Sequence, residues 1–111
     1  MNSEYTILLY YKYIRIKDPE LEKVRQMDVC RALGLTGRII VANEGINGTV
    51  EGKTEDTEKY IKWMEEDKKF KGIDWKKSTG LGDSFPRLSV KVRKEIVSLH
   101  LVDDNWDIDP Q

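Results

Sequence analysis

Few side chains in this sequence have the chemistry of a covalent catalyst or a metal ligand. The chain contains one cysteine, Cys30, and one histidine, His100, and the two are far apart in sequence. Cys30 falls inside a predicted helix beside apolar residues, whereas nucleophilic cysteines favour helix N-termini and electropositive loops. Two such side chains are also too few for a zinc-type ligand set. We therefore predict a buried, structural Cys30, an ordinary surface His100, and no catalytic residue, metal or cofactor.

Side chains suited to binding are more frequent. Tyr11 and Tyr13 alternate along one predicted strand, and Lys91 and Arg93 alternate along another, so each pair shares one face of its strand. Tyrosine rings can stack on RNA bases, and the cations can contact phosphates. The alternative is that the tyrosines pack on a partner domain while the cations form a solvated strand face.

The segment 38–49, RIIVANEGINGT, is a second candidate for binding and is typical of two strands joined by a short link. Its glycines, Gly45 and Gly48, permit a tight turn and a close backbone approach. Glu44 offers an acceptor and Asn47 an amide, either to a ligand or to the local backbone. The glycines do not follow the strand–GxxxxGK–helix pattern of a phosphate-binding loop.

A predicted alternation of strands and helices positions these residues. Asp18 before Pro19 marks the start of a helix and Gly34 its end, while β-branched, aromatic or alternating runs indicate strands. The predicted strands are residues 5–13, 38–43, 46–51 and 88–97, the predicted helices are 19–33 and 54 to about 68, and residues 73–78 are a candidate extra edge strand.

This order of elements predicts an α+β, ferredoxin-like (βαββαβ) fold. Such a sheet is antiparallel, carries both helices on one face, has its last strand beside its first, and leaves its other face available for solvent or a ligand. We expect Val29, Cys30 and Leu33 to form the buried face of the first helix. The second helix has an apolar stripe at helical spacing, formed by Thr57, Tyr60, Ile61 and Met64.

Two known activities accompany this fold by analogy. An acylphosphatase needs an arginine in a glycine-rich phosphate loop after the first strand, but Arg15 has no glycine beside it. An RNA-recognition motif carries aromatic residues on its third strand, but the corresponding strand here, INGTV at 46–50, has no aromatic residue. An acylphosphatase-like enzyme is therefore only a distant alternative.

Length and charge set the remaining expectations. The 111 residues suit one domain, no apolar run approaches the roughly 20 residues that span a bilayer, and no signal peptide is visible. The lone cysteine fits a reducing compartment, most simply the cytoplasm. Four aspartates in residues 103–111 account for −4 of the net charge of −1, which leaves residues 1–102 mildly basic at +3. We predict a domain over 1–102 and an acidic linker over 103–111.

Three stretches together are similar to a known family. They are YKY at 11–13, GRIIVANEGINGT at 37–49 and VKVRKEIV at 90–97. In this pattern the chain resembles the N-terminal, acylphosphatase-like domain of the rhodanese-related tRNA uridine hydroxylases, which are rhodanese-like sulfurtransferase homologues. The resemblance implies that a rhodanese domain follows, that its loop holds the catalytic cysteine, and that the full-length protein hydroxylates the wobble uridine of tRNA with oxygen. Cys30 does not match that loop.

The resemblance therefore implies an accessory domain that is not catalytic alone, holds tRNA or shapes the active site, and has tRNA and the rhodanese domain as partners, with no membrane. A purely structural domain that docks on the rhodanese domain is the alternative. The residues expected to bind RNA or to dock are Tyr11, Lys12, Tyr13, Arg38, Glu44, Gly45, Asn47, Lys91 and Arg93.

Overall fold

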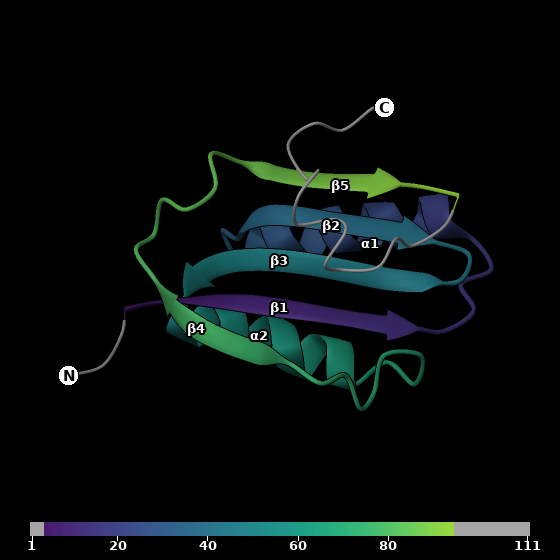
Figure 1. Ribbon diagram of the computed structural model, residues 1–111, viewed down its shortest axis with the longest axis horizontal. Helices are drawn as coiled ribbons and strands as arrows, with labels where there is room; N and C mark the ends of the chain where they lie inside the picture. The colour runs from purple at the N-terminus through teal and green to yellow at the C-terminus, as the bar shows by residue number, and fades with distance from the viewer. Residues whose placement is uncertain (1–3, 95–111) are drawn as a thin grey trace.

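The computed structural model describes residues 4–94, which form one sheet and two helices (Figure 1). The elements in chain order are β1 (Tyr5–Tyr13), α1 (Pro19–Ala32), β2 (Thr36–Ala42), β3 (Gly45–Lys53), α2 (Thr54–Glu65), β4 (Lys76–Gly80) and β5 (Leu88–Val92). Within these residues no helix is long and apolar enough to cross a membrane. The predicted strand residues beyond 94, His100 and the predicted linker 103–111 lie outside the described residues.

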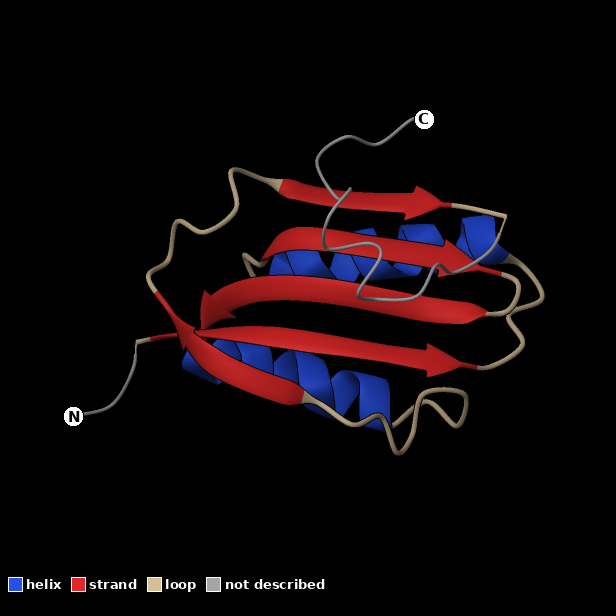
Figure 2. Cartoon of the chain, viewed as in Figure 1, coloured by secondary structure: helices blue, strands red, loops and turns tan. Residues whose placement is uncertain are grey.

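The sheet has the strand order β4-β1-β3-β2-β5, and both helices lie against the same face of it (Figures 1 and 2). The pairs β4–β1, β1–β3 and β3–β2 are antiparallel, whereas β2 and β5 are parallel. The sheet face that carries the helices is called the helix face below, and the opposite face is called the open face.

The predicted fold class was wrong in two respects. The sheet is mixed and five-stranded, not antiparallel and four-stranded, and the last strand does not lie beside the first. Residues 76–80 occupy the edge next to β1, and the chain then crosses to the far edge, where β5 pairs with β2. The candidate extra strand does exist, but it starts at Lys76 and not at residue 73.

The start of α1 follows the sequence signal. The Asp18 side chain caps the helix by accepting a hydrogen bond from the Leu21 N–H at 3.1 Å, and Pro19 takes the first helical position. The predicted buried face was confirmed for Cys30 but wrong for Val29 and Leu33, which are only partly buried, because Glu22 and Gln26 are buried instead. In α2 the buried residues are Thr57, Tyr60 and Met64, as predicted, and Ile61 is partly buried.

A chain of hydrogen bonds explains how polar residues fill the buried stripe of α1. The Tyr60 hydroxyl donates to Gln26 Oε1 at 2.6 Å, which leaves its oxygen to accept the Tyr10 hydroxyl at 2.5 Å. Gln26 Nε2 in turn donates to Glu22 Oε2 at 2.9 Å, and Arg25 pairs with Glu22 at 2.6 Å. The buried polar groups are thus satisfied, and they connect β1 and α2 to α1.

Gly48 makes room for this chain in the middle of β3. Tyr10 and Gly48 are direct partners in the β1–β3 pairing. A Cβ atom at position 48 would lie 2.6 Å from the Tyr10 hydroxyl and 2.7 Å from Cζ of its ring. The absence of a side chain at Gly48 therefore lets the Tyr10 ring lie flat over β3 on the helix face.

Candidate functional site

Strand alternation determines which residues reach the open face. In β1 the buried residues Thr6, Leu8 and Tyr10 point to the helix face, so Tyr11 and Tyr13 point the other way. Strand pairing then carries the alternation across the sheet. Of the residues predicted to bind, those whose side chains lie on the open face are Tyr11, Tyr13, Arg38, Asn47, Lys91 and Arg93.

Lys12 was also among the residues expected to bind, but its side chain does not lie on the open face. It lies between the two tyrosines and therefore on the helix face, where its Nζ donates a hydrogen bond to the Lys71 carbonyl at 2.5 Å. Its role is to tie the end of β1 to the segment that precedes β4, and it does not contribute to the open face.

Asn47 lies near the centre of the open face, and its side chain is 1% exposed. Its direct neighbours across the strands are Tyr11 on β1 and Ile40 on β2. Neither Nδ2 nor Oδ1 of its amide has a hydrogen-bond partner, and no other buried side-chain atom of the described residues is in this state. Because a buried polar atom without a partner costs about 1–3 kcal/mol, this amide is an exception that needs an explanation.

Tyr11 and Tyr13 form the exposed aromatic part of the open face. They are 46% and 60% exposed, and their rings meet edge to face with 6.0 Å between centroids. Pairs of this geometry are stable without a third partner. One ring therefore presents its flat side while the other supports it from the edge.

The predicted contact between these tyrosines and the cations of the last strand is not formed. Lys91 pairs with Ile40, so β2 and β3 separate it from Tyr11. Three strand spacings amount to about 14 Å, which is too far for direct contact. Lys91, Ile40, Asn47 and Tyr11 instead form one row across the sheet, with Asn47 between the cation and the ring.

Lys76 supplies a cation on the tyrosine side of the sheet. It pairs with Leu9 at the beginning of β4, so its side chain lies on the open face one row from Tyr11. Sequence reasoning missed this residue because it placed the last strand, and not residues 76–80, beside β1. The alternation in KKST, with Lys77 paired to Glu58 of α2 at 2.9 Å, is consistent with the assignment.

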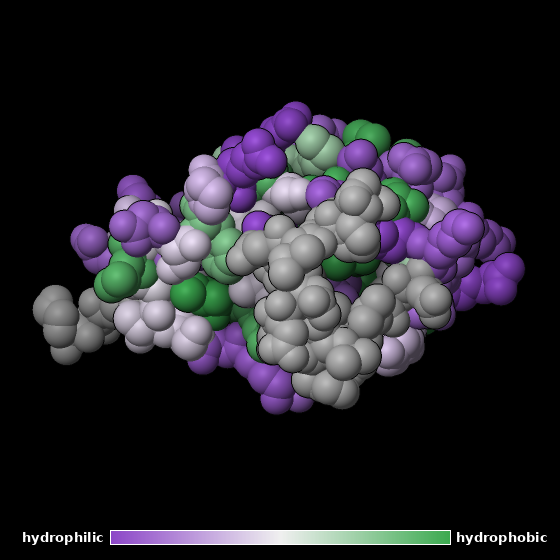
Figure 3. Space-filling view, turned by 45° about the horizontal axis from the view of Figure 1, so that its top comes forward, coloured by the Kyte–Doolittle hydropathy of each residue, from purple (hydrophilic) through white to green (hydrophobic). Residues whose placement is uncertain are grey.

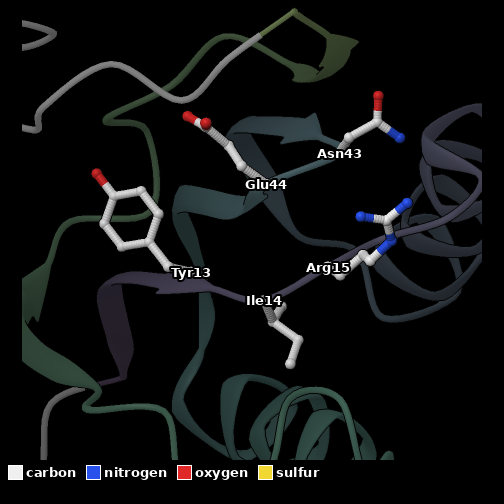
Figure 4. Close-up of a pocket in the computed structure, with 5 residues that line it drawn as sticks. All are labelled: Tyr13, Ile14, Arg15, Asn43 and Glu44. Carbon is white, nitrogen blue, oxygen red and sulfur yellow. The ribbon is translucent and has the colours of Figure 1, made fainter.

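The turn between β2 and β3 forms one wall of a shallow hollow of about 490 Å³, lined by Tyr13, Ile14, Arg15, Asn43 and Glu44 (Figure 4). The Glu44 carbonyl accepts from the Ile14 N–H at 3.0 Å. The Asn43 carbonyl accepts from the Ile16 N–H, and Asn43 Nδ2 donates back to the Ile16 carbonyl. Gly45 follows in β3, is buried, and pairs with Tyr13.

These hydrogen bonds argue against a phosphate site of the acylphosphatase kind. Arg15 and Asn43 do line the same hollow, as Figure 4 shows. However, the N–H groups of Ile14 and Ile16 and the amide of Asn43 are all engaged in holding the turn. A phosphate cradle requires backbone N–H groups that converge on the anion, and these groups point to carbonyls instead.

Glu51, also on the open face, has a structural role. Its carboxylate accepts hydrogen bonds from the N–H groups of Gly82 and Ser84 and from the Ser84 hydroxyl, at 2.9 to 3.0 Å. Burial opposes ionisation of Glu51, but these donors outweigh it and lower the pKa of the carboxyl below its usual value. Glu51 thereby anchors the loop that carries the chain from β4 towards β5.

Cys30 is fully buried, as predicted, and burial raises the pKa of its thiol to about 12. At neutral pH it is therefore a protonated core residue and not a nucleophile. Among residues 4–94 no cluster of histidine, cysteine and carboxylate side chains has the arrangement of a metal site.

Comparison with known proteins gives the family. The profile of the UPF0176 acylphosphatase-like domain matches residues 5–96, which is most of the chain. The chain belongs to this family. It is 40% identical to the tRNA uridine(34) hydroxylase of Streptococcus uberis over 109 residues and 46% identical to that of Staphylococcus saprophyticus over 101 residues. These matches cover 98% and 91% of this chain but only 33% and 32% of the relatives, so the chain spans about a third of their length.

Solved structures share the fold at low sequence identity. BlrB, a BLUF protein in its dark state, superposes with a TM-score of 0.69 at 21% identity, over 98% of this chain and 86% of that one. The BLUF domain of BlrP1 gives a TM-score of 0.68 at 15% identity, over 85% and 67%. At these identities the likeness concerns the arrangement of the sheet and helices alone.

Proposed function

We propose that this chain is an accessory domain of a tRNA-modifying protein of the tRNA uridine(34) hydroxylase type, and that it contacts tRNA through the open face. The names of relatives at 40% and 46% identity support the type of protein. Because the chain spans a third of their length, the proposal assigns the hydroxylation to another part of a longer polypeptide, and more specifically to a rhodanese domain. The proposal implies a cytoplasmic location.

The observation that carries the proposal is the combination of side chains on the open face. The exposed rings of Tyr11 and Tyr13 lie between Lys76 on one edge strand and Lys91 on the other, and Arg93 follows directly after that strand. Single-stranded RNA is bound by aromatic platforms that stack bases and by cations that follow the phosphates. In the space-filling view, apolar residues lie among polar ones in the coloured part of the surface (Figure 3).

The test is the affinity of the 111-residue chain for an anticodon stem-loop with uridine at position 34. Two variants alter the open face, Tyr11→Ala/Tyr13→Ala and Lys76→Ala/Lys91→Ala. The matched control is Lys59→Ala/Lys62→Ala, which removes two positive charges from exposed positions of α2 on the opposite side of the sheet. Binding is measured at several salt concentrations.

The expected result is binding that weakens with salt, with a loss of roughly tenfold or more in each open-face variant. The lysine variant also lowers the slope of log affinity against log salt by about 1 to 2, because up to two phosphate contacts disappear. The control binds as the unaltered chain does. Equal losses in the control and the open-face variants, or binding that does not respond to salt, would contradict the proposal.

A second function is favoured by one observation. The half-buried residues Ile7, Leu9 and Ile40 share the open face with the tyrosines, and an apolar strip of this kind also suits a protein surface. In that case the open face docks on another domain of the same polypeptide and RNA is bound elsewhere. The domain would then bind the separately produced remainder of a full-length relative, and Tyr11→Ala/Tyr13→Ala would abolish that binding while stem-loop affinity stayed the same.

A further inference from the structure

The amide of Asn47 lacks hydrogen-bond partners for both of its polar atoms, and its cross-strand neighbours offer none. Tyr11 and Ile40 flank it across the strands, and neither Nδ2 nor Oδ1 is satisfied. Ile40 has no polar side-chain atom, and the Tyr11 hydroxyl sits at the far end of a ring that stands out from the sheet. With 1% of the residue exposed, bulk water does not reach the amide either.

The Asn43 side chain is hydrogen-bonded, so a missing partner is not a general property of the asparagine residues in this hairpin. Its Nδ2 donates to the Ile16 carbonyl at 2.9 Å and holds the hairpin turn against the segment after β1. Asn43 is exposed and satisfied, whereas Asn47 is buried and unsatisfied. The buried amide therefore has no structural bond that accounts for it.

We infer that Asn47 is the hydrogen-bonding group of a nucleobase site on the open face, in which a base lies against the Tyr11 ring and directs its polar edge to the Asn47 amide. This inference rests on the proposed function and names the part of RNA that the open face recognises. An amide offers one donor and one acceptor side by side, and a uracil edge offers the complementary pair, N3–H beside a carbonyl oxygen.

The heights of the two side chains above the sheet suit this arrangement. Directly opposed residues of antiparallel strands have Cβ atoms about 5 Å apart, and their side chains stand roughly perpendicular to the sheet. A base placed face to face with the tall Tyr11 ring therefore points its edge down towards the sheet, where the shorter Asn47 lies. Lys91, in the same row beyond Ile40, brings positive charge to the side from which the phosphates would approach.

Because Asn47 is 1% exposed, entry of a base requires a neighbouring side chain such as Tyr11 to change its rotamer. Tyr11 is 46% exposed, so its ring has free space on one side. Rotamer changes of this size are common when a surface binds its partner. Once the base is seated, both amide atoms and the two atoms of the base edge are paired, so the unsatisfied state is removed.

The experiment combines one protein variant with one modified base. The protein variant is Asn47→Leu, which keeps the branching of the side chain and removes its polar atoms. The modified RNA is the same stem-loop with N3-methyluridine at position 34, which lacks the N3–H donor. Affinities of the 111-residue chain and of Asn47→Leu for both RNAs are measured at one salt concentration, and thermal unfolding checks that the variant is folded.

The inference predicts that methylation weakens binding to the unaltered chain roughly tenfold, and that Asn47→Leu weakens binding of the uridine RNA by a similar factor. In Asn47→Leu the two RNAs bind equally well, because the group that distinguishes them is gone. If Asn47→Leu binds the uridine RNA as tightly as the unaltered chain does, or still discriminates, the inference is overturned.

The outcome also separates the inference from the proposed function. RNA binding that depends on Tyr11, Tyr13 and the lysines but not on Asn47 would overturn the inference and leave the proposed function standing. If the unaltered chain binds neither RNA, both fail together. If Asn47→Leu leaves RNA affinity unchanged but weakens binding to another protein domain, then a protein and not a base pairs with the amide. That result would overturn the inference.

Discussion

Asn43 and Asn47 lie four residues apart in one hairpin, yet only the first has a hydrogen-bonded side chain. The difference follows from the face on which each residue falls. Asn43 sits in the turn within reach of the Ile16 carbonyl, whereas Asn47 sits between Tyr11 and Ile40 in the middle of the sheet. Under our inference, the Asn47 side chain is stabilised by a bound base and not by the fold.

This contrast predicts opposite effects on stability in the free chain. Asn47→Leu removes an unsatisfied buried amide and should raise the free energy of unfolding by about 1–3 kcal/mol. Asn43→Leu removes a bond that holds the turn and should lower it by about 1 kcal/mol. Urea unfolding of both variants measures the two changes. A loss of stability in Asn47→Leu as large as that in Asn43→Leu would mean that the amide is satisfied after all.

At the scale of single residues, the sequence placed Tyr11 and Tyr13 on one face of their strand, as the structure has them, because alternation along a strand is local. It could not identify the partner of each side chain. The role of Gly48 illustrates the limit, since the close approach that its lack of a side chain permits is made by Tyr10, which lies in another strand. Lys12 was included among the residues expected to bind, although alternation along β1 sends its side chain to the helix face.

Among the elements, α1 departs furthest from what its sequence predicts. Apolar periodicity favoured Val29 and Leu33, but the helix buries Glu22 and Gln26 instead. Gln26 accepts from Tyr60 and donates to Met64 Sδ, both on α2. Glu22 pairs with Arg25 of the same helix and with Lys69, which follows α2. Such a network is invisible to a rule that counts apolar residues, because its stability depends on tertiary contacts.

The network makes Gln26 the residue on which the docking of α1 depends. Gln26→Leu should lower the free energy of unfolding by about 1–3 kcal/mol, because the Tyr60 hydroxyl and Glu22 lose partners while buried. Asp28→Leu, at an exposed position of the same helix, is the control and should change it by less than about 0.5 kcal/mol. Chemical denaturation measures the free energy of unfolding of both variants. Equal changes in the two would rule out the network as the source of stability.

The positions of the edge strands in the sheet were also predicted wrongly. The run LSVKV predicts a strand correctly but says nothing about which neighbour it pairs with or in which direction. Glu51 on β3 holds the loop at Gly82 and Ser84, from which the chain continues to the edge beside β2. A single carboxylate far away in sequence thus contributes to the topology, and no local pattern reveals it.

The anchoring by Glu51 predicts a dependence of stability on pH. Since its pKa in the folded chain lies below the unfolded value of about 4.3, the carboxylate stabilises the fold fully above about pH 5. That contribution is lost as the pH falls through the lowered pKa. Glu51→Gln should therefore cost about 1–3 kcal/mol at pH 7 and progressively less below pH 4, as measured by urea unfolding at each pH. A difference between the two proteins that stays constant from pH 7 to pH 3 would show that the charge of Glu51 is not what the loop requires.

For the whole molecule, one side of the sheet holds the core, and the other side is the surface for which we propose a binding role. The helix face carries the core and the buried polar chain. The open face carries exposed rings, cations at both edges and an unsatisfied amide at its centre. The likeness to BLUF domains concerns the arrangement of the sheet alone, so the function has to be tested on the open face itself.

The most direct test is a nuclear magnetic resonance titration of the isotopically labelled 111-residue chain with the uridine-34 anticodon stem-loop. We expect the shifts to concentrate on open-face residues of β1, β3 and β2, with the side-chain NH2 signals of Asn47 among the most affected and those of Asn43 unchanged. The exposed positions of α1 and α2 should stay unaffected. Shifts confined to the helices, or no shift in the Asn47 side chain while RNA is bound, would contradict the account.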